Sequence, residues 1–343
     1  MFTICLLVFT IIIAVAFDIM NGFHDAANSI ATVVSTRVLT PRQAVLWAAF
    51  FNFVAMFIFA PKVADTISKI VKIEPNDPVY ITVIACGLIG AVLWDLLTWW
   101  LGLPTSSSHA LIGGLSGAGI AHAGMDALRL DMLITTIQFI VLSPLIGFVL
   151  GFIFILALYW LFRNYRPVTI NHFFRKGQLF SAALYSIGHG ANDAQKTMGV
   201  IMALLLAVGA LEPNAQLSLF NPQTFWIILV CQTAMCLGTA FGGWRIVKTM
   251  GMKITKLRPI GGFCAETAGA ITLFFATHLG VPVSTTHTIT GSIIGVGSAI
   301  STFSRIKWGV ATRILWAWFL TIPAAGLISA GCLYLSKLLM AAT

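Results

Sequence analysis

Charged residues are scarce in this sequence. Only 9 % of its 343 residues are charged, whereas soluble domains typically have about 25 %. Hydrophobic residues make up 58 % of the chain, and apolar runs long enough to cross a bilayer recur along its length. Runs such as 134–162 lack the alternation that is typical of the strands of a membrane β-barrel. The composition therefore predicts an all-α polytopic membrane protein and argues against a soluble domain.

The sequence also lacks the patterns of a metal-binding or exported chain. Its six cysteines lie mostly inside apolar runs, and Cys231 and Cys236 have neither metal-site spacing nor a neighbouring histidine. We therefore predict no disulfide, no permanent metal and no permanently bound cofactor. The first twenty residues lack the basic start and the cleavage site of a signal peptide, so we interpret them as a first membrane span. The net charge of +9 fits basic cytoplasmic loops better than a nucleic-acid partner.

We predict about ten membrane passes in two halves. The first half is 1–162, the second is 179–343, and a short basic cytoplasmic linker, 163–178, joins them. The predicted passes are 2–34, 43–60, 79–101, 104–120, 132–162, 179–210, 224–243, 259–279, 281–300 and 313–338.

Loop charges predict the orientation of these passes. Lys and Arg are concentrated in alternate loops, beginning with 35–42 and including 163–178. The positive-inside rule makes these loops cytoplasmic and places both termini on the outer, periplasmic side. Five passes on each side of the linker then give the halves opposite topology, which is typical of inverted repeats. Such repeats commonly contain broken or re-entrant helices.

Two related polar motifs interrupt apolar runs, GFHDAANS at 22–29 and GHGANDAQK at 188–196. A charge in hydrocarbon costs at least ~2.5–3.5 kcal/mol, so these residues need a functional reason. Aligning Asp25 with Asp193 gives an offset of 168 residues. The glycines on either side of His189 predict that the helix opens at this motif.

A second pair of motifs is more alike. LGLPTSSSHALIG at 101–113 recurs as LGVPVSTTHTITG at 279–291, at an offset of 178 residues. Two different motifs that recur in the same order at nearly the same offset indicate an internal duplication. In each, Gly then Pro breaks the preceding span, and Pro is suited to the first turn of a new helix.

Hydroxyl groups follow each of these prolines. They lie beside the unpaired N–H groups of a helix start, where the helix dipole also attracts an anion. An isolated Ser or Thr more often bonds to its own backbone, but a matched pair of such segments favours an oxyanion site. The predicted anion contacts are Ser106, Ser107, Ser108, Ser284, Thr285 and Thr286.

The acidic motifs are predicted to form the cation side of the same site. Carboxylate and amide oxygens of Asp25, Asn28 and Asp193 suit a hard cation or a proton relay. Asn192 and Lys196 are assigned to the substrate, although Lys196, one turn after Asp193, could equally neutralise that acid.

Further polar residues within spans are weaker candidates. Histidines at matched places in the hydroxyl motifs could carry a proton or contact substrate, and packing is an equally good interpretation. These second-rank candidates are His24, His109, His287, Glu266 and Asp95, with Asp18 of similar standing.

With these motifs in view, the chain resembles the inorganic phosphate transporter (PiT) family across nearly its whole length. Gly190-Ala191-Asn192-Asp193 matches the Gly-Ala-Asn-Asp motif of that family, and 22–25 matches it loosely. The Gly-x-Pro-x-Ser elements stand at 102–109 and 280–287. The form of both acidic motifs is similar to the bacterial low-affinity Pit branch, whereas sodium-coupled members generally continue the second motif toward Val-Ala-Asn.

The resemblance implies a membrane phosphate symporter, and for this branch one driven by protons that carries phosphate as a neutral complex with a divalent metal. Two features depart from the family. His24 stands where the consensus has Asn, which puts a direct cation ligand there in doubt. The linker 163–178 is much shorter than the large hydrophilic domain of many members.

We therefore predict a secondary-active phosphate symporter in the bacterial inner membrane, not an enzyme, that works by alternating access. Sodium coupling and another oxyanion such as sulfate are the alternatives. A channel is disfavoured by broken inverted repeats, and an enzyme by the poor geometry of the neighbours Ser108 and His109. The expected partners are phosphate and the lipid bilayer, and a homo-oligomer is compatible with the sequence.

Overall fold

The computed structural model describes residues 2–72, 77, 79–212, 214–253, 255–300 and 307–342. Across these ranges the chain is helical, and its one strand-like feature is an isolated bridge between Val71 and Leu128. The predicted basic loop around Arg305 lies outside the described residues. The all-α prediction is confirmed for the described residues.

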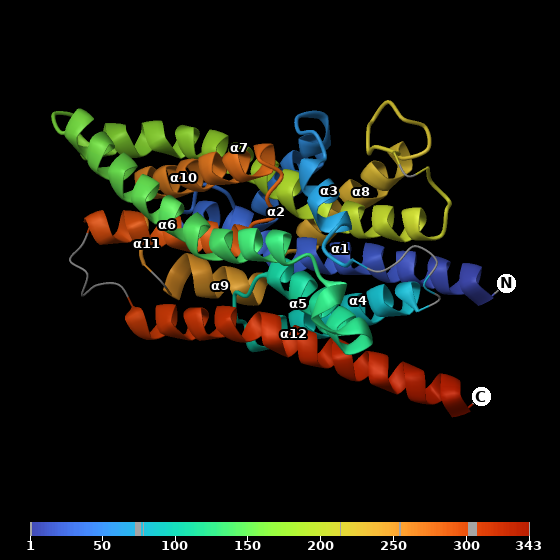
Figure 1. Cartoon of the computed structure of the whole chain (residues 1–343). Coiled ribbons are helices and arrows are strands. Elements are labelled where there is room, and N and C mark those ends of the chain that lie inside the picture. The colour runs from blue at the N-terminus through green and yellow to red at the C-terminus, as the bar shows by residue number, and fades with distance from the viewer. Residues whose placement is uncertain are drawn as a thin grey trace.

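Twelve α-helices are described, and they fall into two sets of six with the same order of long and short members (Figure 1). The first set is α1 Phe2–Ser35, α2 Pro41–Val54, α3 Lys62–Ser68, α4 Tyr80–Leu101, α5 Ser107–Ala123 and α6 Leu130–Leu161. The second set is α7 Pro167–Ala207, α8 Phe225–Phe241, α9 Trp244–Lys253, α10 Pro259–His278, α11 Thr285–Ile300 and α12 Trp308–Ala342. Two short 3₁₀ helices, η1 Ala55–Phe57 and η2 Gly124–Ala127, complete the described helices. Both ends of the chain lie at the same end of the bundle in Figure 1.

Five described helices, α1, α4, α6, α10 and α12, are long and apolar enough to cross a membrane, and the number rises to seven if each bent pair counts as one span. The chain is thus a membrane protein, while the predicted number of ten passes stays a prediction. Exposed residues on these helices are largely apolar, as for Leu327 of α12 at 74 % exposure, because lipid rather than water surrounds them.

The predicted breaks at the two acidic motifs are wrong. α1 and α7 run without interruption through 22–29 and 188–196. The glycines of these motifs bring backbones together instead: a Cβ on Gly22 would collide with the backbone of Met235, and one on Gly190 with that of Asn52. Small residues commonly allow such close approach between membrane helices.

The bends lie in other segments. α2 with η1 meets α3 at 84°, so the predicted pass 43–60 is divided, and α8 meets α9 at 71°. The predicted loop 163–178 is also largely helical, because α7 begins at Pro167, where proline suits a first helical turn.

The last helix of each set packs against the fifth helix of the other set, so that α6 lies along α11 and α12 along α5. Gly291 of α11 meets the backbone of Pro144 in α6, and Gly113 of α5 meets that of Ile322, beside Pro323, in α12. These glycines end the two hydroxyl motifs, so the motifs encode this crosswise packing as well as polar groups.

Candidate functional site

The hydroxyl motifs form two matching helix starts. Gly102 and Gly280 have φ of +66° and +72°, which ends the preceding helices, and non-helical backbone follows as far as α5 and α11. Ser106 Oγ accepts a hydrogen bond from the His109 N–H at 3.3 Å, and Ser284 Oγ accepts one from the His287 N–H at 3.1 Å. These serines cap their own helices, and the predicted proline-led helix starts are confirmed.

Each acidic side chain accepts a hydrogen bond from the hydroxyl segment of its own half. Ser107 donates to Asp25 Oδ2 at 2.8 Å, and Thr285 donates to Asp193 Oδ2 at 3.0 Å. Ser107 and Thr285 occupy matching positions, as do the two acids. The acid–hydroxyl pair is therefore repeated with the duplication, and both acids are buried.

A second pair of contacts crosses between the halves. Asn28 Nδ2 in α1 donates to Thr286 Oγ1 at 2.9 Å and to Thr285 Oγ1 at 3.1 Å. Lys196 in α7 donates to Ser108 Oγ of α5, and it also pairs with Asp193. Through these contacts, four segments that are distant in sequence meet at one buried polar cluster.

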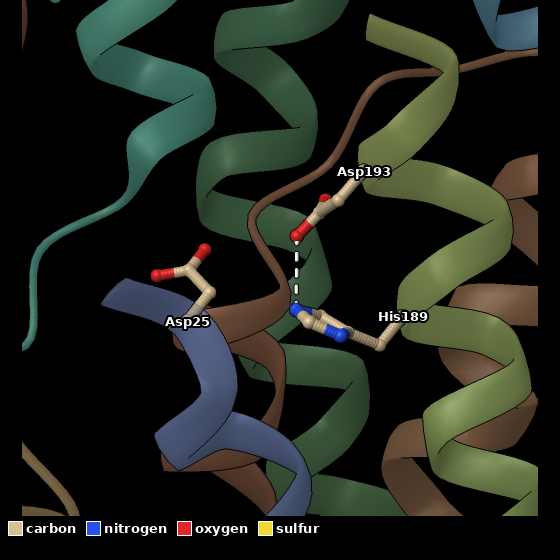
Figure 2. Close-up of side chains that lie close together, drawn as sticks. All are labelled: Asp25, His189 and Asp193. Atoms are coloured by element: carbon tan, nitrogen blue, oxygen red, sulfur yellow. Dashed lines mark ion pairs between the residues drawn. The ribbon is translucent and has the colours of Figure 1, made fainter. Parts of the chain in front are cut away.

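Asp25, His189 and Asp193 lie together at this cluster (Figure 2). Their ligand atoms all lie within 4.8 Å of one another, a spacing that could hold a metal ion. His189 Nε2 is 3.2 Å from Asp193 Oδ2, one turn along α7, and its Nδ1 is 3.2 Å from Asn52 Oδ1. Carboxylate and imidazole together suit a divalent cation.

Comparison with known proteins supports the motifs on which this site depends. The pattern described as the phosphate transporter family matches residues 21–329 of the chain. The chain belongs to this family. That range includes every residue of the cluster just described.

Relatives in the family cover almost the whole chain. A probable low-affinity inorganic phosphate transporter of Rhizobium meliloti (strain 1021) is 54 % identical over 335 residues, covering 97 % of each chain. One with the same description in Bacillus subtilis (strain 168) is 44 % identical over 332 residues, covering 95 % of this chain and 96 % of that one. These relatives are described as transporters, not enzymes.

A solved structure described as the sodium-dependent phosphate transporter has the same fold as this chain. Its TM-score is 0.85 at 25 % sequence identity, and the match covers 97 % of this chain and 99 % of that chain. The helix arrangement of this family member is therefore shared along almost the entire length of both chains.

Some predicted residues have internal hydrogen-bond partners. Asn192 donates to Thr277 Oγ1 at 3.1 Å and to the carbonyl of Val281 at 3.3 Å, and its Oδ1 accepts from the Val283 N–H at 3.2 Å. These bonds hold the extended segment that leads into α11. The amide thus orients one wall of the site.

The second-rank candidates lie at different distances from the cluster. His109 and His287 are in edge-to-face contact, with ring centroids 4.5 Å apart, and neither ring nitrogen pair has a hydrogen-bond partner among the described residues. Glu266 accepts hydrogen bonds from Thr32 at 2.6 Å and Ser181 at 2.5 Å, which joins α10 to α1 and α7. The Asp18 carboxylate is fully buried and has no hydrogen-bond partner among the described residues.

Sequence reasoning missed three residues of the site. Asn21 accepts a 2.5 Å hydrogen bond from Ser107, one turn before Asp25. His189 was treated only as part of a helix break, and Thr105, before the serine run, bonds to Thr98 at 2.9 Å. The spacing of Asn21 and His189, four residues before each motif acid, places them on the same helix face as that acid and was a usable signal.

Proposed function

We propose that this protein is a proton-coupled symporter of inorganic phosphate in the bacterial inner membrane. Membership of the phosphate transporter family and the relatives' descriptions support the substrate. The observation that carries the proposal is the buried cluster in which Asp25 and Asp193 each accept a hydrogen bond from a helix-start hydroxyl.

Phosphate would bind between the starts of α5 and α11. The hydroxyls of Ser107, Ser108, Thr285 and Thr286 and the free N–H groups of the two first turns are donors suited to an anion with several acceptor oxygens. Lys196, already in contact with Ser108, would add charge. Ser106 and Ser284 would contribute as helix caps that orient these donors.

The same hydrogen bonds suggest how phosphate and a proton are coupled. A hydroxyl has a single proton to donate, so Ser107 and Thr285 cannot donate to phosphate and keep their bonds to the carboxylates. A carboxylate that loses a donor and gains an anion as neighbour is favoured to take up a proton or a cation. Phosphate and its coupling ion would then enter the site together.

A co-transported divalent cation would fit beside the phosphate. Asp25, His189 and Asp193 supply two carboxylates and one imidazole within 4.8 Å of one another. A cation there would be cargo bound with phosphate, and its charge would offset that of the anion. Phosphate carried as a metal complex is part of this proposal.

Alternating access would be produced by two inverted-topology halves, 1–162 and 179–343, that move around this site. Both termini would lie on the periplasmic side, as the loop charges predict. The crosswise packing of α6 on α11 and of α12 on α5 would tie each hydroxyl segment to the opposite half. Rocking of one half would then change which side of the membrane the site faces.

The test is uptake of radiolabelled phosphate by the purified protein in liposomes with the membrane potential clamped. An inward pH gradient without sodium should drive accumulation, and Mg²⁺ should increase it. A sodium gradient at equal pH should not drive accumulation. Sodium coupling, favoured by the description of the matching solved structure, predicts the reverse pattern, and excess sulfate as competitor tests the alternative oxyanion.

A further inference from the structure

His24 and Asn192 occupy matching positions in the two halves, immediately before Asp25 and Asp193. Asn192 uses both ends of its amide to hold the strand-like segment before α11. His24 takes the equivalent structural place and approaches the segment before α5 through Thr105, but with a group that can carry a proton. The two halves therefore differ in chemistry at one place.

Hydrogen bonds connect both nitrogens of the His24 ring. Nδ1 is 2.8 Å from Asp25 Oδ1. Nε2 is 3.2 Å from Thr98 Oγ1 and 3.3 Å from Thr105 Oγ1, and the two hydroxyls are 2.9 Å apart. The imidazole thus joins a carboxylate of the site to a pair of hydroxyls on its other side, the arrangement that a proton shuttle requires.

Asp95 lies one turn before Thr98 on α4. Its side chain is fully buried, and neither carboxylate oxygen has a hydrogen-bond partner among the described residues. Thr98 Oγ1 lies 3.2 Å from the backbone carbonyl of Asp95. A buried acid without a donor is costly and calls for a function. At the 178-residue offset the second half has Leu273, so this acid is also particular to the first half.

Charged groups around Asp95 come mainly from α1. His24 and Asp25 are the titratable groups that act electrostatically on its carboxylate. α4 also packs on α5, α7, α9 and α12. From α9, Arg245 lies over the Trp99 ring and donates to the Trp100 carbonyl, about one turn further along the helix.

We propose that Asp95 is a second proton-binding site, connected to the coupling acid Asp25 through His24 and the hydroxyls of Thr98 and Thr105. This inference rests on the proposed proton-coupled function. It separates the place where the proton travels from the place where phosphate is held, and it leaves Asp25 ionised to contact a cation or the hydroxyls.

The transfer moves one proton and leaves the intermediate groups neutral. The O–H bond of protonated Asp25 breaks as an N–H bond forms at His24 Nδ1. The Nε2–H bond breaks, and its proton passes to Thr98 Oγ. The hydroxyl's own proton passes to the Asp95 carboxylate, where a new O–H bond forms. The imidazole ends as its other tautomer, and the reverse transfer restores it.

The experiment compares two kinds of phosphate movement in liposomes containing the purified full chain. Counterflow at equal pH reports phosphate binding and alternating access without net proton movement. Accumulation under a pH gradient of one unit at clamped potential reports coupling, and each coupled proton supplies about a tenfold concentration ratio. Proton uptake is measured with a pH dye trapped in the same vesicles.

Asp95→Asn and His24→Asn should keep counterflow within about twofold of the wild type and lose the roughly tenfold accumulation. Both should also lose phosphate-dependent proton uptake. The double variant Thr98→Val/Thr105→Val should behave in the same way, and Thr98→Ser/Thr105→Ser, which restores the hydroxyls, should recover coupling. Asp131→Asn, an exposed acid at the start of α6, is the matched control and should accumulate phosphate normally.

Normal accumulation by Asp95→Asn would overturn the inference, and so would loss of counterflow together with accumulation, since that result indicates a structural role. The wild type is measured first in the same vesicles. If it accumulates phosphate only under a sodium gradient, the proposed proton coupling and this inference both fail. If it responds to the pH gradient while the variants remain coupled, the inference alone fails.

Discussion

Asn28 of α1 and Lys196 of α7 occupy matching positions, and each donates a hydrogen bond to the hydroxyl segment of the opposite half. Asn28 reaches Thr286, and Lys196 reaches Ser108, which also match each other. The amide makes a neutral contact, whereas the ammonium in addition forms an ion pair with Asp193. The duplication has thus kept the geometry of the cluster and changed its charge.

The Lys196–Asp193 pair leads to a first prediction. Lys196→Met leaves a buried carboxylate unpaired, a change that costs about 3–5 kcal/mol in protein interiors. The variant should unfold at a lower temperature in detergent, and its transport should fall. Adding Asp193→Asn should recover most of the thermal stability without recovering transport. A double variant that is no more stable than Lys196→Met would contradict the pairing.

Asn28 allows a test of the contact between halves. Asn28→Ala removes both donors to the first turn of α11, and a lost hydrogen bond of this kind is worth about 1–3 kcal/mol. The KM for phosphate should rise about tenfold, because the start of α11 is no longer held in place. Asn214→Ala, at an exposed loop position, is the matched control. Equal KM values for the two variants would argue against this role of Asn28.

The packing of motif glycines predicts a difference between two alanine substitutions. Gly190→Ala places a methyl group against the Asn52 backbone and should lower the unfolding temperature, by a mechanism that typically costs about 1–3 kcal/mol. Gly331→Ala, where an added Cβ meets nothing within 4 Å, should be neutral or slightly stabilising. Thermal unfolding of both variants in one detergent measures the difference. Similar unfolding temperatures would show that Gly190 is not in close contact.

A pH effect is expected at the loop before α4. Burial opposes ionisation of Asp77, but its hydrogen bonds from His122, at 2.8 Å, and from the Val79 N–H, at 2.7 Å, outweigh burial and lower its pKa below the usual value. A lowered pKa adds stability above the unfolded-state pKa, and this stability is lost as the pH falls through the folded-state pKa. Asp77→Asn should therefore be less stable than the wild type at pH 7, and the difference should shrink toward acid pH.

The matched control for Asp77 is Asp65. Asp65 pairs with Lys69 at 2.7 Å, but both side chains are largely exposed, and exposed pairs contribute little. Unfolding temperatures measured from pH 7 down to acid pH should show the Asp77 effect and almost none for Asp65→Asn. A difference between Asp77→Asn and the wild type that stays constant with pH would rule out ionisation as its cause.

Composition and the motif pair were enough to predict the helical membrane class and the helix starts at Ser107 and Thr285. Both depend on local physics: long apolar runs, a proline at a helix start and hydroxyls beside free N–H groups. The offsets of 168 and 178 residues also identified which side chains would match in the two halves. That match is visible in the contacts of Asp25 and Asp193.

The errors arose where a local pattern has two tertiary meanings. The glycines at 22 and 190 fit a helix break or a close helix crossing, and the crossing with α8 or α2 was not visible in a single sequence. The bend between α2 and α3 was missed because the run from 43 to 60 is apolar throughout. Likewise, nothing local to Asn192 indicates that its amide holds the segment before α11.

The central claim is that the hydroxyls beside Asp25 and Asp193 bind phosphate, and phosphate uptake by Ser107→Ala and Asp193→Asn in liposomes tests it most directly. Thr312→Ala is the control, because this exposed hydroxyl bonds to the Trp308 carbonyl of its own helix. Ser107→Ala should transport about tenfold less phosphate than the wild type, since a hydrogen bond to a charged group is worth about 1.5–3 kcal/mol. Asp193→Asn should lose gradient-driven uptake, and Thr312→Ala should match the wild type. Normal uptake by both site variants would contradict the account.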